Sequence, residues 1–252
     1  MAITVQTSAA KAPPKGTPMS STRKIAFVAG VFYLITFISI PTLALYGPVK
    51  NHRDWILGSG GHTGILVGGF LEVVVALAGI GTAVTLYPVI KRQNEGAALG
   101  FVAARILEAS MIFAGVVSLL SLVTLRQDLG GAAGANAAAL VTTSASHVAV
   151  YNWTFLLSQS LMPAFNALLL GSVMYRSRLV PRIIPLVGLI GAPFLICTFI
   201  VTLFGGMKLG SPQLAAVPVA AWELSLGVWL VVKGFRPSPI TAAIDATSRP
   251  PA

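Results

Sequence analysis

Long apolar stretches separated by short polar segments dominate the hydropathy pattern of this chain. Six of them meet or exceed the roughly 20 residues that a helix rising about 1.5 Å per residue needs to cross a bilayer. They cover Ile25–Tyr46, Gly64–Ile90, Ala97–Leu125, Ala149–Tyr175, Pro181–Phe204 and Ala215–Val232. The pattern predicts an all-α polytopic membrane protein, a bundle of six transmembrane helices.

The segments outside this apolar region are polar and rich in proline. They are residues 1–24 and 237–252. Such composition is typical of disordered chain. We therefore expect a membrane domain over 25–236 between two disordered tails. The connection 126–148 is rich in Gly, Ala, Ser and Thr, and its second half, Ala137–His147, is predicted to be helical as it enters the fourth span.

Composition supports a membrane protein and argues against a nucleic-acid-binding one. Hydrophobic residues make up 55% of the chain and charged residues only 10%, against about 25% charged in soluble domains. Mean hydropathy is +0.83. The net charge of +10 comes from Lys and Arg that never form a run longer than two. Because no basic patch interleaved with aromatic residues results, we expect no nucleic-acid partner.

The basic residues are distributed unevenly between the two sides of the predicted bundle. Twelve of the seventeen fall in the tails and in the connections on the same side as the tails, four fall on the opposite side, and Arg105 lies within a span. Because cytoplasmic loops carry an excess of Lys and Arg, this asymmetry predicts that both termini are cytoplasmic. Attraction to anionic lipid headgroups is a further expected contribution of the same residues.

Four ionisable residues lie inside the apolar stretches: Glu72, Arg105, Glu108 and Glu223. A charge at the centre of a membrane helix costs about 2.5–3.5 kcal/mol on insertion scales. Glu72 and Glu223 each fall within a stripe of small residues at spacings of three and four, which is typical of close helix contacts. We therefore expect these side chains to face the protein interior rather than lipid.

Amide side chains mark one face of the fourth span. Asn152, Gln159 and Asn166 are seven residues apart, so they share a helix face with a small drift per heptad. Counting residues from the helix ends places Asn166 level with Arg105 and Glu108. We predict one internal polar cluster, a candidate ligand or proton site, made of Glu72, Arg105, Glu108, Gln159, Asn166 and Glu223.

Several functions remain open for such a cluster. Its residues can serve packing alone, as an ion pair that orients the third helix and as hydrogen bonds between spans. We favour a non-enzymatic membrane protein whose cluster is structural or binds a lipid or small ligand. The alternatives are a small transporter or proton-coupled carrier and, third, an intramembrane enzyme that uses the carboxylates as acid and base.

Motifs for cofactors and metals are missing from the sequence. The chain has one cysteine, no HxxxH or HExxH spacing, and no P-loop or dinucleotide fingerprint. We expect no cofactor, no metal and no catalytic residues. The expected partners are the lipid bilayer and a small ligand or a proton, and a bundle this small leaves oligomerisation open.

Five stretches carry a family resemblance. They are RKIAFVAGVFYLITFIS (23–39), TLYPVIKR (85–92), AARILEAS (103–110), YRSRLVPRIIPLVGLIG (175–191) and WELSLGVWLVVKG (222–234). Together they resemble the bacterial integral-membrane family known as domain of unknown function 4386. The most specific parts are Arg105-x-x-Glu108-Ala109 and Glu223 to Leu226, whereas 126–148 matches least. The resemblance implies a multi-spanning bacterial plasma (inner) membrane protein, and it supplies no catalytic residues because the family has no established activity.

Overall fold

The computed structural model describes residues 19–58, 60–129, 134, 136–209 and 214–247. All regular elements in these ranges are helical. They are α1 (Ser21–Thr36), η1 (Phe37–Ser39), α2 (Thr42–Leu45), α3 (Gly47–Asn51), η2 (Trp55–Leu57), α4 (Thr63–Ile90), α5 (Glu95–Leu129), α6 (Ala137–Leu156), η4 (Leu157–Leu161), α7 (Met162–Ser177), α8 (Ile183–Leu203), η5 (Leu214–Ala216), α9 (Val217–Val232) and α10 (Pro239–Thr247). The predicted all-α class is confirmed for the described residues.

Six helical segments are long and apolar enough to cross a membrane, as the hydropathy pattern predicts. They are α1 with η1, α4, α5, the continuous run α6–η4–α7, α8, and η5 with α9. Large apolar side chains are exposed on the outer surfaces of these spans, for example Phe70, Leu77, Val117, Ile190 and Phe194. A surface this apolar fits lipid rather than water. The chain is therefore a multi-pass membrane protein.

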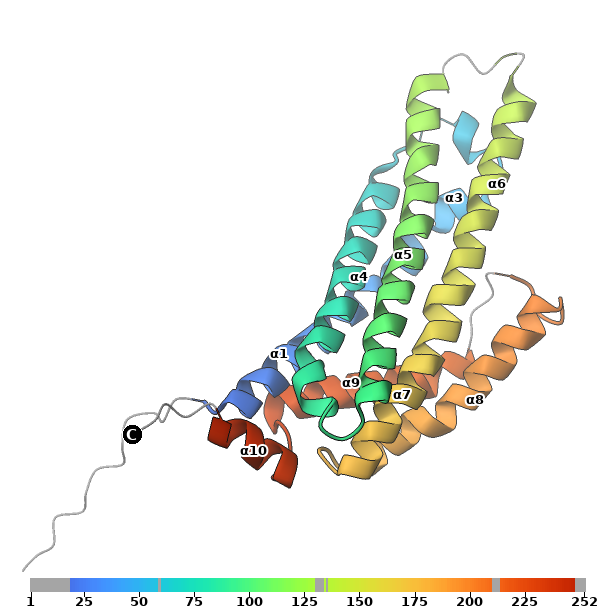
Figure 1. Ribbon diagram of the computed structural model, residues 1–252. Helices are drawn as coiled ribbons and strands as arrows, with labels where there is room; N and C mark the ends of the chain where they lie inside the picture. The colour runs from blue at the N-terminus through green and yellow to red at the C-terminus, as the bar shows by residue number, and fades with distance from the viewer. Residues whose placement is uncertain (1–18, 59, 130–133, 135, 210–213, 248–252) are drawn as a thin grey trace, which may run out of the picture.

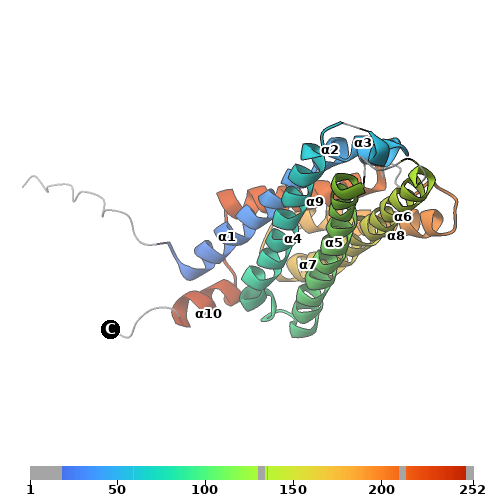
Figure 2. The same ribbon diagram turned by 90° about the horizontal axis from the view of Figure 1, so that it is seen from above.

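The spans form a closed ring in chain order. Each packs against the next, from α1 on α4 through α5, α7 and α8 to α9, and α9 returns to pack against α1. Figure 1 shows α4, α5 and α6 side by side, with α1, α8 and α9 crossing them at a slant. The view from above shows the same divergence of directions (Figure 2). The ring interior is consequently the place where side chains from all six spans can meet.

The two ends of the ring differ in their connections. The terminal end holds the start of α1, the end of α9, and the connections 91–94 and 178–182, whereas the loop end holds residues 40–58, 60–62, 204–209 and 214–216. Toward the terminal end the interior is filled by a continuous core of apolar side chains. Its largest fully buried members include Tyr33, Leu86, Phe101, Leu170 and Trp222. This core closes the ring interior on that side.

Close packing of α8 against α9 depends on Gly188. A Cβ at this position would lie 2.5 Å from Cδ2 of Trp222, which is fully buried. We expect Gly188→Ala to lower the free energy of unfolding by about 1–3 kcal/mol, because the tryptophan must shift in a filled core. Thermal unfolding in detergent micelles measures the effect.

Gly96→Ala is the matched control, since a Cβ there meets only Asn94 Oδ1, at 3.6 Å. It lies in the first turn of α5, where alanine favours a helix more than glycine does. Equal effects of the two substitutions would contradict the role assigned to Gly188.

The first span ends earlier than predicted. It stops at Ser39, whereas the apolar stretch continues to Tyr46. Pro41 has no N–H to donate to the carbonyl of Phe37, so the α-helical hydrogen-bond ladder is interrupted there. The following helices α2, α3 and η2 instead form a second core at the loop end, where Tyr46 and Ile56 are buried against α5 and α6.

The C-terminal segment also departs from its prediction. Residues 237–252 are predicted to be disordered, but Pro239–Thr247 form α10, which packs beside α1 (Figures 1 and 2). Asp245 accepts hydrogen bonds from the backbone N–H of Thr22 at 3.0 Å and from its hydroxyl at 2.8 Å. Contacts with α1 that the local composition does not reveal thus stabilise this helix. Residues 1–18, most of the predicted N-terminal tail, lie outside the described ranges.

The fourth span begins earlier than its apolar stretch and contains an irregular turn. Helix α6 starts at Ala137, so the predicted helical entry into this span is confirmed. The π-helical turn η4 follows and ends two residues before Pro163. Proline lacks an N–H, so the carbonyl of Gln159 cannot accept its usual α-helical hydrogen bond. Such π turns are frequent at functional sites.

Candidate functional site

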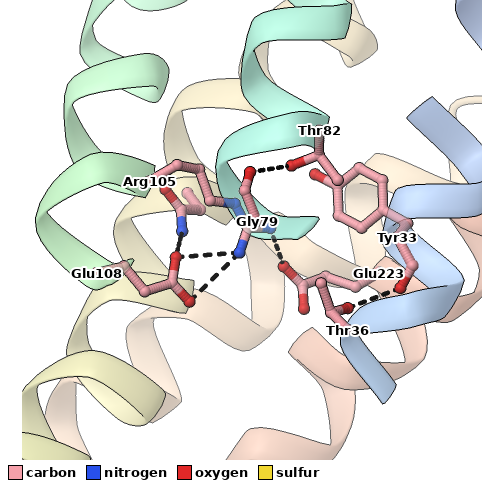
Figure 3. Close-up of polar contacts among 8 residues, drawn as sticks. Tyr33, Thr36, Gly79, Thr82, Arg105, Glu108 and Glu223 are labelled. Carbon is pink, nitrogen blue, oxygen red and sulfur yellow. Dashed lines mark hydrogen bonds and ion pairs between the residues drawn. The ribbon is translucent and has the colours of Figure 1, made fainter. Parts of the chain in front are cut away.

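Arg105 of α5 lies at the centre of a buried polar cluster, hereafter the arginine cluster, formed with Glu108, Glu223 and Asn166. Its Nη1 is 3.0 Å from Oε2 of Glu108, and its Nη2 is 2.7 Å from Oε1 of Glu223. Nδ2 of Asn166 donates to Oε2 of Glu108 at 2.7 Å. Figure 3 shows the guanidinium between the two carboxyl groups. One cation therefore joins acids from two different spans.

The surrounding helices hold the guanidinium from several sides. Arg105 and Glu108 are three residues apart on α5, so they share one helix face. The rings of Tyr33 from α1 and Phe101 from α5 lie 5.5 and 5.6 Å from the guanidinium carbon, within cation–π range. Gly79 of α4 lies beside the Arg105 side chain (Figure 3). The Arg105 side chain is only 3% exposed.

The arginine cluster forms part of the wall of a cavity inside the ring, hereafter the ring cavity. Its volume is about 190 Å³. All six spans line it, through Thr36, Phe37, Ser39, Ile40, Val75, Ala76, Gly79, Arg105, Glu108, Ala109, Ile112, Gln159, Pro163, Leu195, Ala216, Val219, Ala220 and Glu223. Ile40 is 60% exposed, so the ring cavity meets the surface near the loop end of α1. The apolar core closes the opposite side.

Hydrogen-bonding capacity in the arginine cluster is not used up. Nε of Arg105 and Oδ1 of Asn166 are buried and have no hydrogen-bond partner within the described ranges. Oε2 of Glu223 likewise accepts no hydrogen bond from any residue that the structure describes, and this side chain is 14% exposed. Buried polar groups are normally paired. Because Glu223 is partly exposed, its Oε2 is the atom of the cluster that can bind a further polar group.

Glu72 is held in a separate position nearer the loop end. Its Oε1 accepts from the hydroxyl of Tyr151 at 3.0 Å, and its Oε2 accepts from the hydroxyl of Tyr46 at 3.3 Å. Burial raises the pKa of Tyr46 above its usual range, so its hydroxyl keeps the proton that it donates. Gly68, one turn before Glu72, makes room for the tyrosine, since a Cβ there would lie 2.5 Å from Cε1 of Tyr46.

A cation lies close to this second site. Nζ of Lys50 from α3 is 5.1 Å from the centre of the Tyr151 ring. Burial lowers the pKa of Lys50, while attraction by the Glu72 carboxylate acts in the opposite direction. Tyr46 lies in the turn between α2 and α3, Lys50 in α3 and Tyr151 in α6, and none of these segments contributes to the arginine cluster. Glu72, Tyr46, Tyr151 and Lys50 thus form a distinct loop-end cluster.

The prediction of one cluster that includes Glu72 is therefore corrected. The structure brings together Arg105, Glu108, Asn166 and Glu223 and leaves Glu72 apart. Counting depth from helix ends assumed that all spans end level at one membrane face. Helix α4 begins two turns before Glu72, and Gly79, which faces Arg105, lies a further two turns along. Glu72 is consequently about 10 Å along α4 from the level of the guanidinium.

Gln159 lies between the two clusters. It lines the ring cavity and also a smaller cavity of about 10 Å³ beside Glu72 and Tyr151. No residue in the described ranges gives it a side-chain hydrogen bond. Gln159 is thus a wall residue rather than a member of the arginine cluster.

The described residues contain no group of three or more His, Cys, Asp or Glu placed to hold a metal ion.

Three tyrosines contact the buried charges without having been identified from the sequence: Tyr33, Tyr46 and Tyr151. A signal for two of them exists, since Tyr33 and Tyr151 lie within spans, where a phenolic hydroxyl needs a partner or an interface. Tyr46 lies beyond the first span, and only the folding of 40–62 onto α4 brings it to Glu72.

Comparisons with known proteins identify the family. No curated protein and no solved structure matches the chain. A family model described as "Domain of unknown function (DUF4386)" matches residues 28–234, which include five complete spans, most of the first span and every residue of the arginine cluster. The match covers most of the chain and agrees with the resemblance carried by the motifs around Arg105 and Glu223. The chain belongs to the domain of unknown function 4386 family.

Proposed function

We propose that this protein is a non-enzymatic membrane protein of the bacterial plasma membrane that binds a small ligand in the ring cavity. The main support is Oε2 of Glu223, a carboxylate oxygen on the wall of that cavity that accepts no hydrogen bond from the described residues and belongs to a partly exposed side chain. A purely structural ion pair would be expected to fill its own donors and acceptors. A ligand that enters the ring cavity would donate to this oxygen of Glu223.

The proposed orientation places the terminal end of the ring in the cytoplasm. Lys91, Arg92, Arg178, Arg182 and Lys233 all lie at that end. The positive-inside tendency supports this assignment. The ring cavity then opens toward the opposite, outer half of the membrane.

A non-enzymatic role is favoured by the way the two acids are held. Glu108 and Glu223 both accept hydrogen bonds from the same guanidinium. This arrangement stabilises both as hydrogen-bond acceptors, whereas acid–base catalysis needs one carboxyl group poised to donate a proton. An acid–base pair at this position would require the ligand to displace Arg105 first.

A small transporter or proton-coupled carrier is the second candidate. It is favoured by the position of Glu108 and Glu223, at the point where the ring cavity meets the closed core. Carriers bind their substrates near the midplane between halves that open alternately. Transport would require a second state in which the core around Leu86 and Trp222 opens toward the terminal end.

A cavity-blocking substitution tests ligand binding. Ala220 lines the ring cavity, whereas its neighbour Ala221 is exposed on the outer surface of α9. We expect a set of small amphipathic molecules of positive, negative and zero charge to contain members that raise the melting temperature of the wild type. The same molecules should stabilise Ala221→Leu and fail to stabilise Ala220→Leu, because only the larger side chain of Ala220→Leu occupies ligand space.

The size of the effect follows from mass action. A ligand present at one hundred times its Kd stabilises the folded state by about 2.7 kcal/mol. Stabilisation that persists in Ala220→Leu would place binding elsewhere on the protein. Molecules that stabilise none of the three proteins would contradict a ligand-binding role.

A further inference from the structure

The arginine cluster contains more acids than bases. One guanidinium faces two carboxylates, and within the described part of the chain no other Lys, Arg or His residue lines the ring cavity. The third polar partner, Asn166, is neutral. With both acids ionised the wall therefore carries one uncompensated negative charge. In an interior of low dielectric constant such a charge acts strongly on whatever enters.

The excess charge is on the accessible side of the arginine cluster. Glu223 is the most exposed of the three charged residues, at 14% of its side chain against 3% for Arg105. Its Oε1 is bound to Arg105, while Oε2 accepts no hydrogen bond from the described part of the chain. A group that enters the ring cavity thus meets a carboxylate oxygen before it meets the guanidinium.

The remaining wall is mostly apolar. Phe37, Ile40, Ile112, Leu195 and Val219 line it, drawn from α1, α5, α8 and α9 and the turns beside them. Sites of this kind, apolar with a few placed polar groups, bind ligands whose bodies are apolar and whose orientation a polar group determines. The ring cavity accordingly suits a ligand with one charged group and a hydrocarbon body.

We infer that the ring cavity binds small organic cations, with the cationic group against Glu223 and the apolar body against the α1, α5 and α8 wall. This inference rests on the proposed ligand-binding function and names the class of ligand. A cation brings the arginine cluster to neutrality. An anion of the same shape meets the exposed carboxylate, and an uncharged molecule gains only from contact with the apolar wall.

Three probes of matched size separate these cases. Benzyltrimethylammonium is the cation, neopentylbenzene is its uncharged isostere, and benzenesulfonate is an anion with the same ring. Binding to the full-length protein is measured in nanodiscs of zwitterionic phosphatidylcholine and corrected for uptake by protein-free nanodiscs. We expect the cation to bind at least tenfold more tightly than the isostere, and benzenesulfonate to show no saturable binding.

Two variants locate the bound cation. Glu223→Gln removes the charge, retains an acceptor for Arg105 and should weaken cation binding at least tenfold. Ala220→Leu keeps every charge and should abolish binding by filling the space. Glu72→Gln is the control, because it neutralises a buried carboxyl group outside the ring cavity. It should leave the Kd unchanged within twofold.

The outcomes that overturn the inference are distinct from those that overturn the proposed function. Equal binding of neopentylbenzene would reject a cation site and leave a ligand cavity in place. No cation binding, or binding that Glu223→Gln does not weaken, would also reject it. The proposed function is rejected separately, if no molecule of any charge stabilises the wild type while failing to stabilise Ala220→Leu.

Discussion

Replacing Arg105 with glutamine is expected to lower the free energy of unfolding by about 3–5 kcal/mol, the cost of removing one partner of a buried ion pair. The guanidinium is bonded to Glu108 at 3.0 Å and to Glu223 at 2.7 Å. Without it, two carboxyl groups from α5 and α9 face each other with only Asn166 as a donor. Unfolding by added denaturing detergent, followed by circular dichroism, measures the loss.

A rescue variant separates the loss of the cation from the loss of packing. The triple variant Arg105→Gln, Glu108→Gln, Glu223→Gln removes all three charges while keeping similar volumes. It should recover at least half of the lost free energy of unfolding, because no buried charge is then left without a partner. Arg92→Gln, at an exposed position outside the ring, serves as the control. An Arg105→Gln effect below about 1 kcal/mol would show that the interior is hydrated enough to solvate the acids alone.

Replacing Glu72 with alanine is expected to lower the free energy of unfolding by about 3–6 kcal/mol. Two tyrosine hydroxyls, from Tyr46 and Tyr151, donate to this carboxylate, and hydrogen bonds to charged groups contribute roughly 1.5–3 kcal/mol each. Alanine leaves both hydroxyls without an acceptor in a region that excludes water. It also disconnects the α2–α3 segment from α4 and α6, so proteolysis within residues 47–62 should become faster.

Glutamine at the same position distinguishes hydrogen bonding from charge. Glu72→Gln keeps one carbonyl oxygen as acceptor. It should lower the free energy of unfolding by less than half of the amount that Glu72→Ala does. Tyr151→Phe removes one donor and should fall between the two. If glutamine were as harmful as alanine, the negative charge itself, facing Lys50 across the Tyr151 ring, would be the stabilising element.

The separation of the two clusters links these stability tests to function. Glu72 lies outside the ring cavity, whereas Glu223 lines it. Substitutions at Glu72 should therefore change stability without changing the affinity of the ring cavity for a cation. Substitutions at Glu223 should change affinity, and glutamine there should change stability less than Arg105→Gln does.

Much of the architecture follows from local sequence. A membrane span is recognised from about 20 consecutive apolar residues, because the bilayer requires that length of every helix that crosses it. The same reasoning predicted that Glu72, Arg105 and Glu108 face inward, and all three are buried. Their orientation is a local property as well, since the rest of each helix surface is apolar and suits lipid.

Irregular elements were predictable only in part. Pro163 indicates a disturbance of the fourth span, and the structure has a π turn directly before it. Pro41 explains why the first span ends at Ser39, although hydropathy alone predicts that it continues to Tyr46. Helix α10 could not be predicted from its composition, because Asp245 finds its partner, Thr22, more than two hundred residues away.

The sequence by itself determined the number of spans, the inward direction of the charged side chains and the family. Only the tertiary structure decided which charges meet. Helices α8 and α9 are shorter than α4 and α5 and slant across them, so equal counts from helix ends do not correspond to equal depths (Figure 1). Hydropathy is summed along one helix. Contact between Arg105 and Glu223 depends instead on the relative tilt and offset of two helices, and these two residues are 118 positions apart in the sequence.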